Sequence, residues 1–142
     1  MDQILQNSIS LFKETEGSTF QYTNEIGKEV FVFADKDQLL RVFNNLIKNA
    51  LQAIPNHQEG QIIISLARES DFYIVRVEDN GSGIGTDVLD EIFTPNFTTK
   101  TTGMGLGLAM TKNIIEELSG KIWFKTEQEK GSVFYVSIPV YK

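Results

Sequence analysis

The stretch FYIVRVEDNGSGIG, residues 72–85, decides the fold, because in it a hydrophobic strand runs directly into a cluster of glycines. Strand alternation places Asp79 on the same face as Val75 and Val77, so a carboxylate ends an apolar row. A carboxylate at the edge of a core is costly unless hydrogen-bond donors or cations meet it. The exocyclic amine of adenine is one such donor, and the sequence therefore suggests a base-binding site here.

Gly81 and Gly83 follow this carboxylate directly. Backbone without side chains bends easily around a flat base, and Ile84 would add an apolar contact to it. The alternative is a plain turn that ends the strand, since Asp, Asn and Gly are common turn formers. The segment alone leaves both interpretations open.

A second glycine cluster, GMGLGLAM at residues 103–110, runs into a predicted helix. Free backbone amides and the positive end of the helix dipole converge at such a place and favour a bound phosphate. The spacing matches neither the dinucleotide-binding pattern nor the P-loop. Lys100, in the threonine-rich stretch before the cluster, would add a cation near a terminal phosphate, although a solvated lysine is the plainer interpretation.

The helix predicted after Asp35 carries three asparagines, Asn44, Asn45 and Asn49, which are poor helix formers. Asn45 and Asn49 are four residues apart and therefore lie on one face. Mg²⁺ prefers oxygen ligands shared with substrate phosphates, so these two amides would serve as metal ligands. Hydrogen bonds from the asparagines to nearby backbone are the alternative.

The remaining pattern predicts an α+β fold, a two-layer sandwich in which a mixed, mostly antiparallel sheet carries helices on one face. Asp35 with Gln38 three residues on predicts a capped helix that ends near Pro55. The other predicted elements are helices over residues 1–12 and Leu106–Leu118, helical turns within Thr86–Ile92, a loop over Phe93–Gly103, and strands over Thr19–Thr23, Val30–Phe33 (around a turn at Asn24–Lys28), Ile62–Ala67, Phe72–Glu78, Lys121–Thr126 and Ser132–Ile138.

The 142 residues suit one domain, with residues 1–17 as a first helix or linker and 86–102 as a loop over the site. The net charge of −6 argues against a nucleic-acid surface. No cysteine, membrane-spanning run or secretory signal is found, so we expect a cytoplasmic domain that makes no direct membrane contact.

Four segments in this order, NNLIKNALQA, VEDNGSGIG, IFTPNFTTK and GMGLGLAM, resemble the N, G1, F and G2 boxes of sensor histidine kinases. The resemblance covers the chain from about residue 35 onward. It implies the ATP-binding catalytic domain of a two-component kinase, in the Bergerat fold shared with gyrase, the Hsp90 chaperones and MutL. The F and G2 wording is closest to nitrogen-regulation (NtrY/NtrB-like) kinases.

The resemblance also implies roles for individual residues. Asn45 and Asn49 would bind Mg²⁺ and phosphate, with Asn45 and Lys100 as catalytic residues, and Asp79 would bind the adenine amine. The other implied nucleotide-binding residues are Gly81, Gly83, Ile84, Gly85, Phe93, Phe97, Thr98, Gly103, Met104, Gly105, Leu106, Gly107 and Leu108. The stretch between Gly85 and Gly103 would be the ATP lid, packed by its two phenylalanines.

One departure separates branches of this superfamily. Its ATP-hydrolysing members carry a glutamate one turn before the metal-binding asparagine, and here that place is Asn45. With no glutamate between Asp35 and Ile54, the helix lacks an obvious general base for water. We therefore expect phosphoryl transfer rather than hydrolysis.

The acceptor in this family is a histidine on a separate dimerising helical domain, and a response regulator acts downstream. The sole histidine of this chain, His57, lies in a polar loop and is interpreted as solvated. The sequence keeps two alternatives open: a degenerate module that binds ATP without transferring phosphate, and an ATPase of the Bergerat type.

Overall fold

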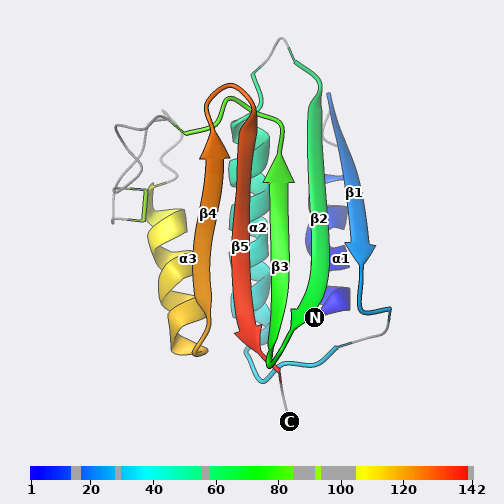
Figure 1. The fold of residues 1–142 in the computed structure, drawn as a ribbon, viewed down its shortest axis with the longest axis vertical. Helices are drawn as coiled ribbons and strands as arrows, with labels where there is room; N and C mark the ends of the chain where they lie inside the picture. The colour runs from blue at the N-terminus through cyan, green and yellow to red at the C-terminus, as the bar shows by residue number, and fades with distance from the viewer. Residues whose placement is uncertain (14–16, 28–29, 56–57, 85–91, 94–104, 141–142) are drawn as a thin grey trace.

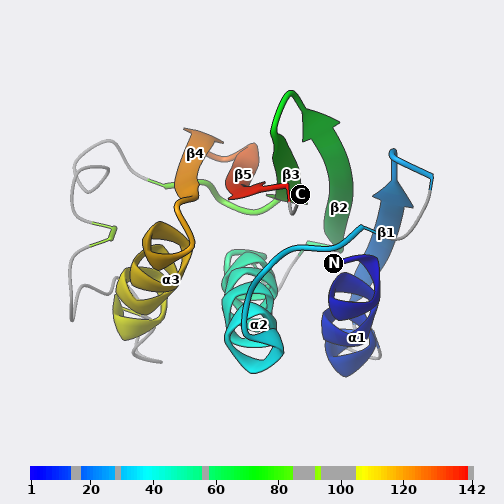
Figure 2. The same ribbon diagram turned by 90° about the horizontal axis from the view of Figure 1, so that it is seen from below.

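The computed structural model describes residues 1–13, 17–27, 30–55, 58–84, 92–93 and 105–140. The described elements are α1 (Asp2–Phe12), β1 (Ser18–Asn24), α2 (Lys36–Gln52), β2 (Gly60–Glu69), β3 (Phe72–Asp79), α3 (Gly105–Glu117), β4 (Lys121–Glu127) and β5 (Gly131–Pro139). The strands form one sheet in the order β1-β2-β3-β5-β4 (Figure 1). Viewed along the strands, the helices all lie on one side of this sheet (Figure 2).

The sheet is mixed and mostly antiparallel. β1 runs parallel to β2, whereas the β2–β3, β3–β5 and β4–β5 pairs are antiparallel. The predicted α+β two-layer sandwich is confirmed. Within the described residues, no helix combines the length and apolar character that crossing a bilayer requires.

The core lies between the helices and one face of the sheet. One cross-strand row of this face contains Ile64, Val77 and Phe134, all at most 3% exposed. α2 covers the row with an apolar stripe that includes the fully buried Phe43 and Ile47. These contacts fix the rotation of α2, and with it the direction in which its asparagines point.

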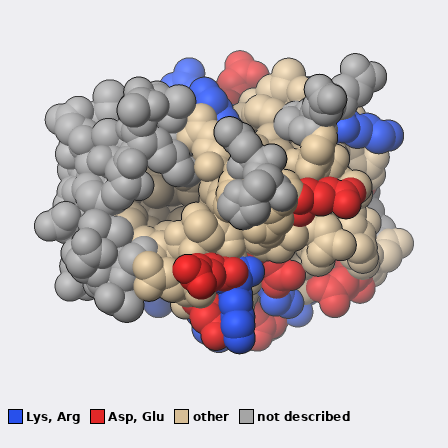
Figure 3. Space-filling model, turned by 90° about the horizontal axis from the view of Figure 1, so that it is seen from above, with Lys and Arg blue, Asp and Glu red and all other residues tan. Residues whose placement is uncertain are grey.

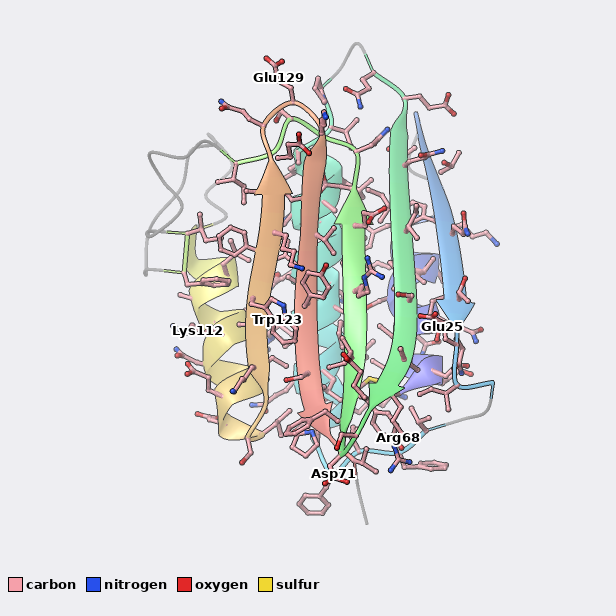
Figure 4. All side chains as sticks on the ribbon, in the orientation of Figure 1. Glu25, Arg68, Asp71, Lys112, Trp123 and Glu129 are labelled. Carbon is pink, nitrogen blue, oxygen red and sulfur yellow. The ribbon has the colours of Figure 1, made fainter. Side chains whose placement is uncertain are left out.

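The opposite face of the sheet carries none of the described helices and is polar and aromatic. Trp123 lies on the side of the sheet away from the helices (Figure 4) and stacks on Tyr135 with ring centroids 5.2 Å apart. Arg76 lies 5.5 Å from the centre of the Tyr135 ring. The sheet therefore has one face for packing and one for solvent.

Capping at the start of α2 follows the sequence. The Asp35 side chain accepts hydrogen bonds from the backbone amides of Asp37 and Gln38, as the predicted cap requires. The helix ends at Gln52, close to the predicted Pro55. The N-terminal helix is also present and belongs to the core, because Leu5 of α1 is fully buried.

One predicted strand is wrong. Residues 30–33 alternate between buried Val30 and exposed Phe31 and Phe33, but they pair with no strand in the described sheet. The predicted hairpin partner, β1, instead pairs with β2. The segment crosses from the sheet layer to α2 (Figure 2), so its alternation reflects contact with the core without a neighbouring strand.

Candidate functional site

A polar row crosses the helix-facing side of the sheet at one end. Asp79 of β3 lies opposite Ser132 of β5, and Ser132 lies opposite Thr126 of β4. Asp79 and Ser132 are each 5% exposed. The row follows directly on the apolar rows of the core, so polar groups replace apolar ones where β3 ends.

Asp79 is fixed by the chain that follows it. Its Oδ1 accepts a hydrogen bond from the backbone amide of Gly81 at 2.9 Å. This short loop gives the buried carboxylate one defined orientation, as a recognition group requires. Its place beside Ser132 and at the end of the apolar face agrees with the position expected from strand alternation.

The segment after Asp79 is clamped on both sides. The Ser82 amide donates to the Ala53 carbonyl at the end of α2 (3.0 Å), and the Ser82 carbonyl accepts from the Glu129 amide (2.6 Å). Glu129 lies in the β4–β5 turn, labelled at the end of the molecule in Figure 4. The segment is thus held between α2 and the β4–β5 hairpin.

The glycines in this segment are required by that clamp. A Cβ on Gly81 would collide with the Ala53 carbonyl, and one on Gly83 would collide with the Glu127 carbonyl. Gly83 also has φ of +75°, which side chains disfavour. Close packing of backbone on backbone therefore accounts for both glycines, whether or not a base lies near them.

Thr126 joins the far end of this segment to the polar row. Its Oγ1 accepts from the Ile84 amide at 2.9 Å and lies 2.8 Å from the hydroxyl oxygen of Ser132. It also lies within hydrogen-bond distance, 3.3 Å, of the Gly131 carbonyl. One hydroxyl thus connects the segment, β4 and β5.

The three asparagines of α2 divide into different roles. Asn44 accepts a hydrogen bond from Ser8 of α1 at 2.5 Å, and Ser8 is 1% exposed. Asn44 is therefore a structural tie between two helices.

Asn45 has a different environment. Its Nδ2 is buried and has no hydrogen-bond partner among the described residues. The Asn45 side chain lies next to Gly107 of α3. A Cβ built on Gly107 would be 3.6 Å from the Asn45 Cγ, which is an ordinary van der Waals contact. A buried amide without a partner costs about 1–3 kcal/mol, so a ligand group is expected to complete it.

Asn49 lies one turn further along α2 and is half-buried. The backbone carbonyl of Asn49 accepts a hydrogen bond from the Ala53 amide at 3.1 Å. The Ala53 carbonyl in turn accepts from the Ser82 amide and lies against Gly81. The last two turns of α2 therefore lie beside the start of α3 at one end and beside the segment after β3 at the other. In this way α2 contacts both glycine clusters.

Phe93 packs on the row next to the polar one. Its ring centroid is 5.9 Å from that of Phe124 and 6.5 Å from that of Phe134. Lys112 of α3 lies 5.8 Å from the centre of the Phe93 ring. Leu108, also in α3, is 8% exposed and belongs to the core, so its expected role in nucleotide binding would be indirect.

Several expected site residues lie outside the described part of the chain. These are Gly85, Phe97, Thr98, Lys100, Gly103 and Met104. Of the helical turns expected within Thr86–Ile92 and the loop expected over Phe93–Gly103, the structure describes only residues 92 and 93. Gly105 and Leu106 begin α3, but the side chain of Leu106 is not described. Their expected roles stay predictions.

Within the described residues, the candidate metal ligands are the neutral asparagine side chains of α2 that the sequence singled out. The described residues include no cluster of three or more His, Cys, Asp or Glu side chains able to hold an ion. The buried amide of Asn45 fits a nucleotide-bound Mg²⁺ or its phosphate, because an amide can present an oxygen to a cation or an N–H group to an anion.

A cavity of about 350 Å³ opens at the same end of the sheet. Its lining includes Ile63, Glu78 and Lys125, which lie on the helix-free face, and it also reaches the three residues of the polar row, Asp79, Thr126 and Ser132. The helices, and with them Asn45, lie on the other side, so we do not assign this cavity to the nucleotide. Acidic and basic side chains are intermixed on the described surface at this end (Figure 3).

Thr126 and Ser132 are site residues that the sequence analysis missed. They lie more than 40 positions after Ile84 and Asp79 along the chain, and each occupies an ordinary strand position. The register of strand pairing brings them beside Asp79, and this register cannot be predicted from the spacing of residues within one segment.

The family described as "Histidine kinase-, DNA gyrase B-, and HSP90-like ATPase" matches residues 34–142. The sensor histidine kinase ZraS of Salmonella typhi is 41% identical over 146 aligned residues, covering 99% of this chain and 30% of that protein. Sporulation kinase A of Bacillus subtilis is 37% identical and covers 95% of this chain and 22% of its own length. The chain thus spans less than a third of the length of these relatives.

Solved structures agree with these relatives. The catalytic domain of histidine kinase ThkA superposes with a TM-score of 0.87 at 31% identity, covering 99% of this chain and 92% of that one. A mycobacterial sensor histidine kinase, MprB, has the same fold, with a TM-score of 0.86 at 21% identity. The chain therefore belongs to the family of histidine kinase-, gyrase B- and Hsp90-like ATPases, and it is a catalytic ATPase domain of the sensor histidine kinase type.

Proposed function

We propose that the chain binds ATP with Mg²⁺ and presents the γ-phosphate to a histidine on a separate dimerising domain. The observation that carries the proposal is the buried Nδ2 of Asn45, which lacks a hydrogen-bond partner among the described residues and belongs to a side chain beside the start of α3. A phosphate oxygen would accept a hydrogen bond from this N–H group, and the ATPase family to which the chain belongs supports ATP as the ligand.

The base would bind at Asp79. Its carboxylate is buried and oriented by the Gly81 amide, so it offers a fixed acceptor to the adenine amine. A site built to hydrogen-bond one exocyclic group discriminates against bases that lack the donor, because such a base cannot form that hydrogen bond with the carboxylate. Adenine is favoured over guanine, which carries a carbonyl oxygen at the corresponding ring position.

The phosphates would bind between α2 and α3. Amides at the start of α3 and the dipole of this helix favour negative charge there, and the Asn45 side chain of α2 lies beside Gly107 in the same region. Asn49, four residues further along α2, would share the face of Asn45 by helical spacing. Mg²⁺, when bound, would neutralise charge on the phosphates. The residues of this chain would hold the γ-phosphate in line with the incoming imidazole.

In the transfer step a bond forms between the imidazole nitrogen and the γ-phosphorus. The bond from phosphorus to the bridging oxygen breaks, and ADP leaves. Catalysis of such a loose transition state is mainly positioning and charge stabilisation. Asn45 is neutral and cannot take a proton from water, so the site favours this transfer over hydrolysis.

The finer assignments remain open to test. The likeness to nitrogen-regulation kinases gains no support from the relatives found, which include ZraS, FixL and sporulation kinases. The proposal is therefore made for sensor histidine kinases as a class. A response regulator as the downstream partner, and a cytoplasmic location, stay predictions from the resemblance.

The test is transfer of label. The chain is mixed with the histidine-bearing dimerisation domain of its parent protein and with γ-labelled ATP and Mg²⁺. We expect acid-labile, base-stable label on that domain and little free phosphate from the chain alone. Rapid phosphate release without labelled histidine would contradict the proposal and favour an ATPase, and nucleotide binding without either product would identify a degenerate module.

A further inference from the structure

The Thr126 hydroxyl lies outside the four sequence boxes but inside the site. It occupies the third position of the polar row that begins at Asp79 and continues through Ser132. Thr126 is half-buried and faces the helix side of the sheet, with Phe124 two residues earlier on the same face. A threonine needed only for strand propensity would not have to meet three polar groups.

The contacts of this hydroxyl are specific. A threonine hydroxyl has one donor hydrogen and two acceptor lone pairs. One lone pair accepts from the Ile84 amide at 2.9 Å. The Ser132 hydroxyl, 2.8 Å away, and the Gly131 carbonyl, 3.3 Å away, use the remaining capacity. The group is thereby fully engaged and fixed in direction.

The Ile84 amide marks the far end of the segment that starts at Asp79. The start is fixed through Gly81, and the middle is fixed through Ser82 by α2 and the β4–β5 turn. The bond to Thr126 fixes the end. Ile84 itself is half-buried and packs against the core, so its position depends on this anchor.

We propose that Thr126 is a positioning residue for adenine-nucleotide binding, which holds the Ile84 amide so that the segment from Asp79 to Ile84 is preformed before the nucleotide arrives. This inference rests on the proposed nucleotide site. Without the hydroxyl, the end of the segment is ordered only when the ligand binds, and that ordering weakens affinity.

Two substitutions separate the hydroxyl from the shape of the side chain. Thr126→Val keeps the shape and removes the hydroxyl, whereas Thr126→Ser keeps the hydroxyl and removes the methyl group. Thr23→Val is the matched control, because Thr23 is an exposed threonine on edge strand β1. Thr126→Ala replaces the valine variant if the latter does not fold.

The measurements are calorimetric titration with ADP and Mg²⁺, thermal unfolding without nucleotide, and hydrogen exchange of the Ile84 amide. Thr126→Val should bind ADP roughly fivefold more weakly, the change that corresponds to one lost hydrogen bond, and its Ile84 amide should exchange faster. Thr126→Ser and Thr23→Val should bind like the parent chain.

The inference is overturned if Thr126→Val binds ADP as tightly as the parent chain. It is also overturned if Thr126→Ser is as weak as Thr126→Val, because the hydroxyl is then not the cause. Failure of the parent chain itself to bind ADP would contradict the proposed function instead, so the two failures are distinguishable.

Discussion

At the scale of the residue, Gly83 shows how closely the site depends on backbone packing. Its φ of +75° and the Glu127 carbonyl beside it together exclude a side chain. Gly27 has a similar φ of +80° but only open space around its Cα. Both glycines therefore have a backbone conformation that disfavours a side chain, but only Gly83 also has another part of the backbone packed against it.

This difference gives a matched pair of substitutions. Gly27→Ala should lower the free energy of unfolding by about 1 kcal/mol, the cost of the left-handed conformation for a residue with a Cβ. Gly83→Ala should lower it by clearly more, because the new methyl group also displaces the β4–β5 turn. Denaturant unfolding of both variants measures the difference, and equal losses would show that the contact with Glu127 does not constrain Gly83.

Local pattern could predict Gly83 as a special position but not its reason. The glycine spacing suggested room for a base, and the structure shows a clamp between α2 and the β4–β5 turn. The clamping partners, Ala53 and Glu127, are distant in sequence. Such requirements arise from tertiary packing, which residue spacing does not encode.

At the scale of the element, α2 is the piece that organises the site. One face buries an apolar stripe, Asn44 ties it to α1, and the Asn45 side chain lies beside Gly107 at the start of α3, where we propose that the phosphates bind. Position 44 lies next to position 45 but about 100° around the helix, which is why neighbouring asparagines have different partners. Any change in the docking of α1 would rotate or shift Asn45.

The tie between α1 and α2 is testable by a double-mutant cycle. Ser8→Ala and Asn44→Ala should each destabilise the fold by about 1–2 kcal/mol, since each leaves a buried polar group without its partner. The double variant should lose less than the sum, with a coupling of about 1 kcal/mol. Additive losses in denaturant unfolding would mean that the two side chains do not interact.

The elements were largely predictable because their signals are local. The Asp35 cap, the apolar stripe of α2 and the alternation of β2 through β5 each lie within one segment. The strand predicted at 30–33 is wrong because these residues alternate in burial but pair with no strand of the described sheet, while β1, on the other side of the predicted turn, pairs with β2. Strand pairing depends on neighbours that local sequence does not specify.

At the scale of the whole molecule, the site is assembled from segments that are remote along the chain. The end of α2, the end of β3, the start of α3 and the β4–β5 hairpin meet at one end of the sandwich (Figure 1). A ligand bound there contacts all of them, so it should stabilise the fold as a unit. The four boxes predicted the first three segments as parts of the site. The two strands of the hairpin were predicted as well, but their place at the site is seen only in the pairing register.

The most direct test of the central claim is calorimetric titration with ADP and Mg²⁺ of the parent chain, Asp79→Asn and Asp71→Asn. Asp71 is an exposed carboxylate in the β2–β3 turn at the opposite end of the sheet, so it serves as the matched control (Figure 4). The parent and Asp71→Asn should bind one nucleotide with equal affinity, and Asp79→Asn should bind at least roughly tenfold more weakly, because a charged hydrogen-bond acceptor is lost. Equal binding by Asp79→Asn, or no binding by the parent chain at millimolar ADP, would contradict the account.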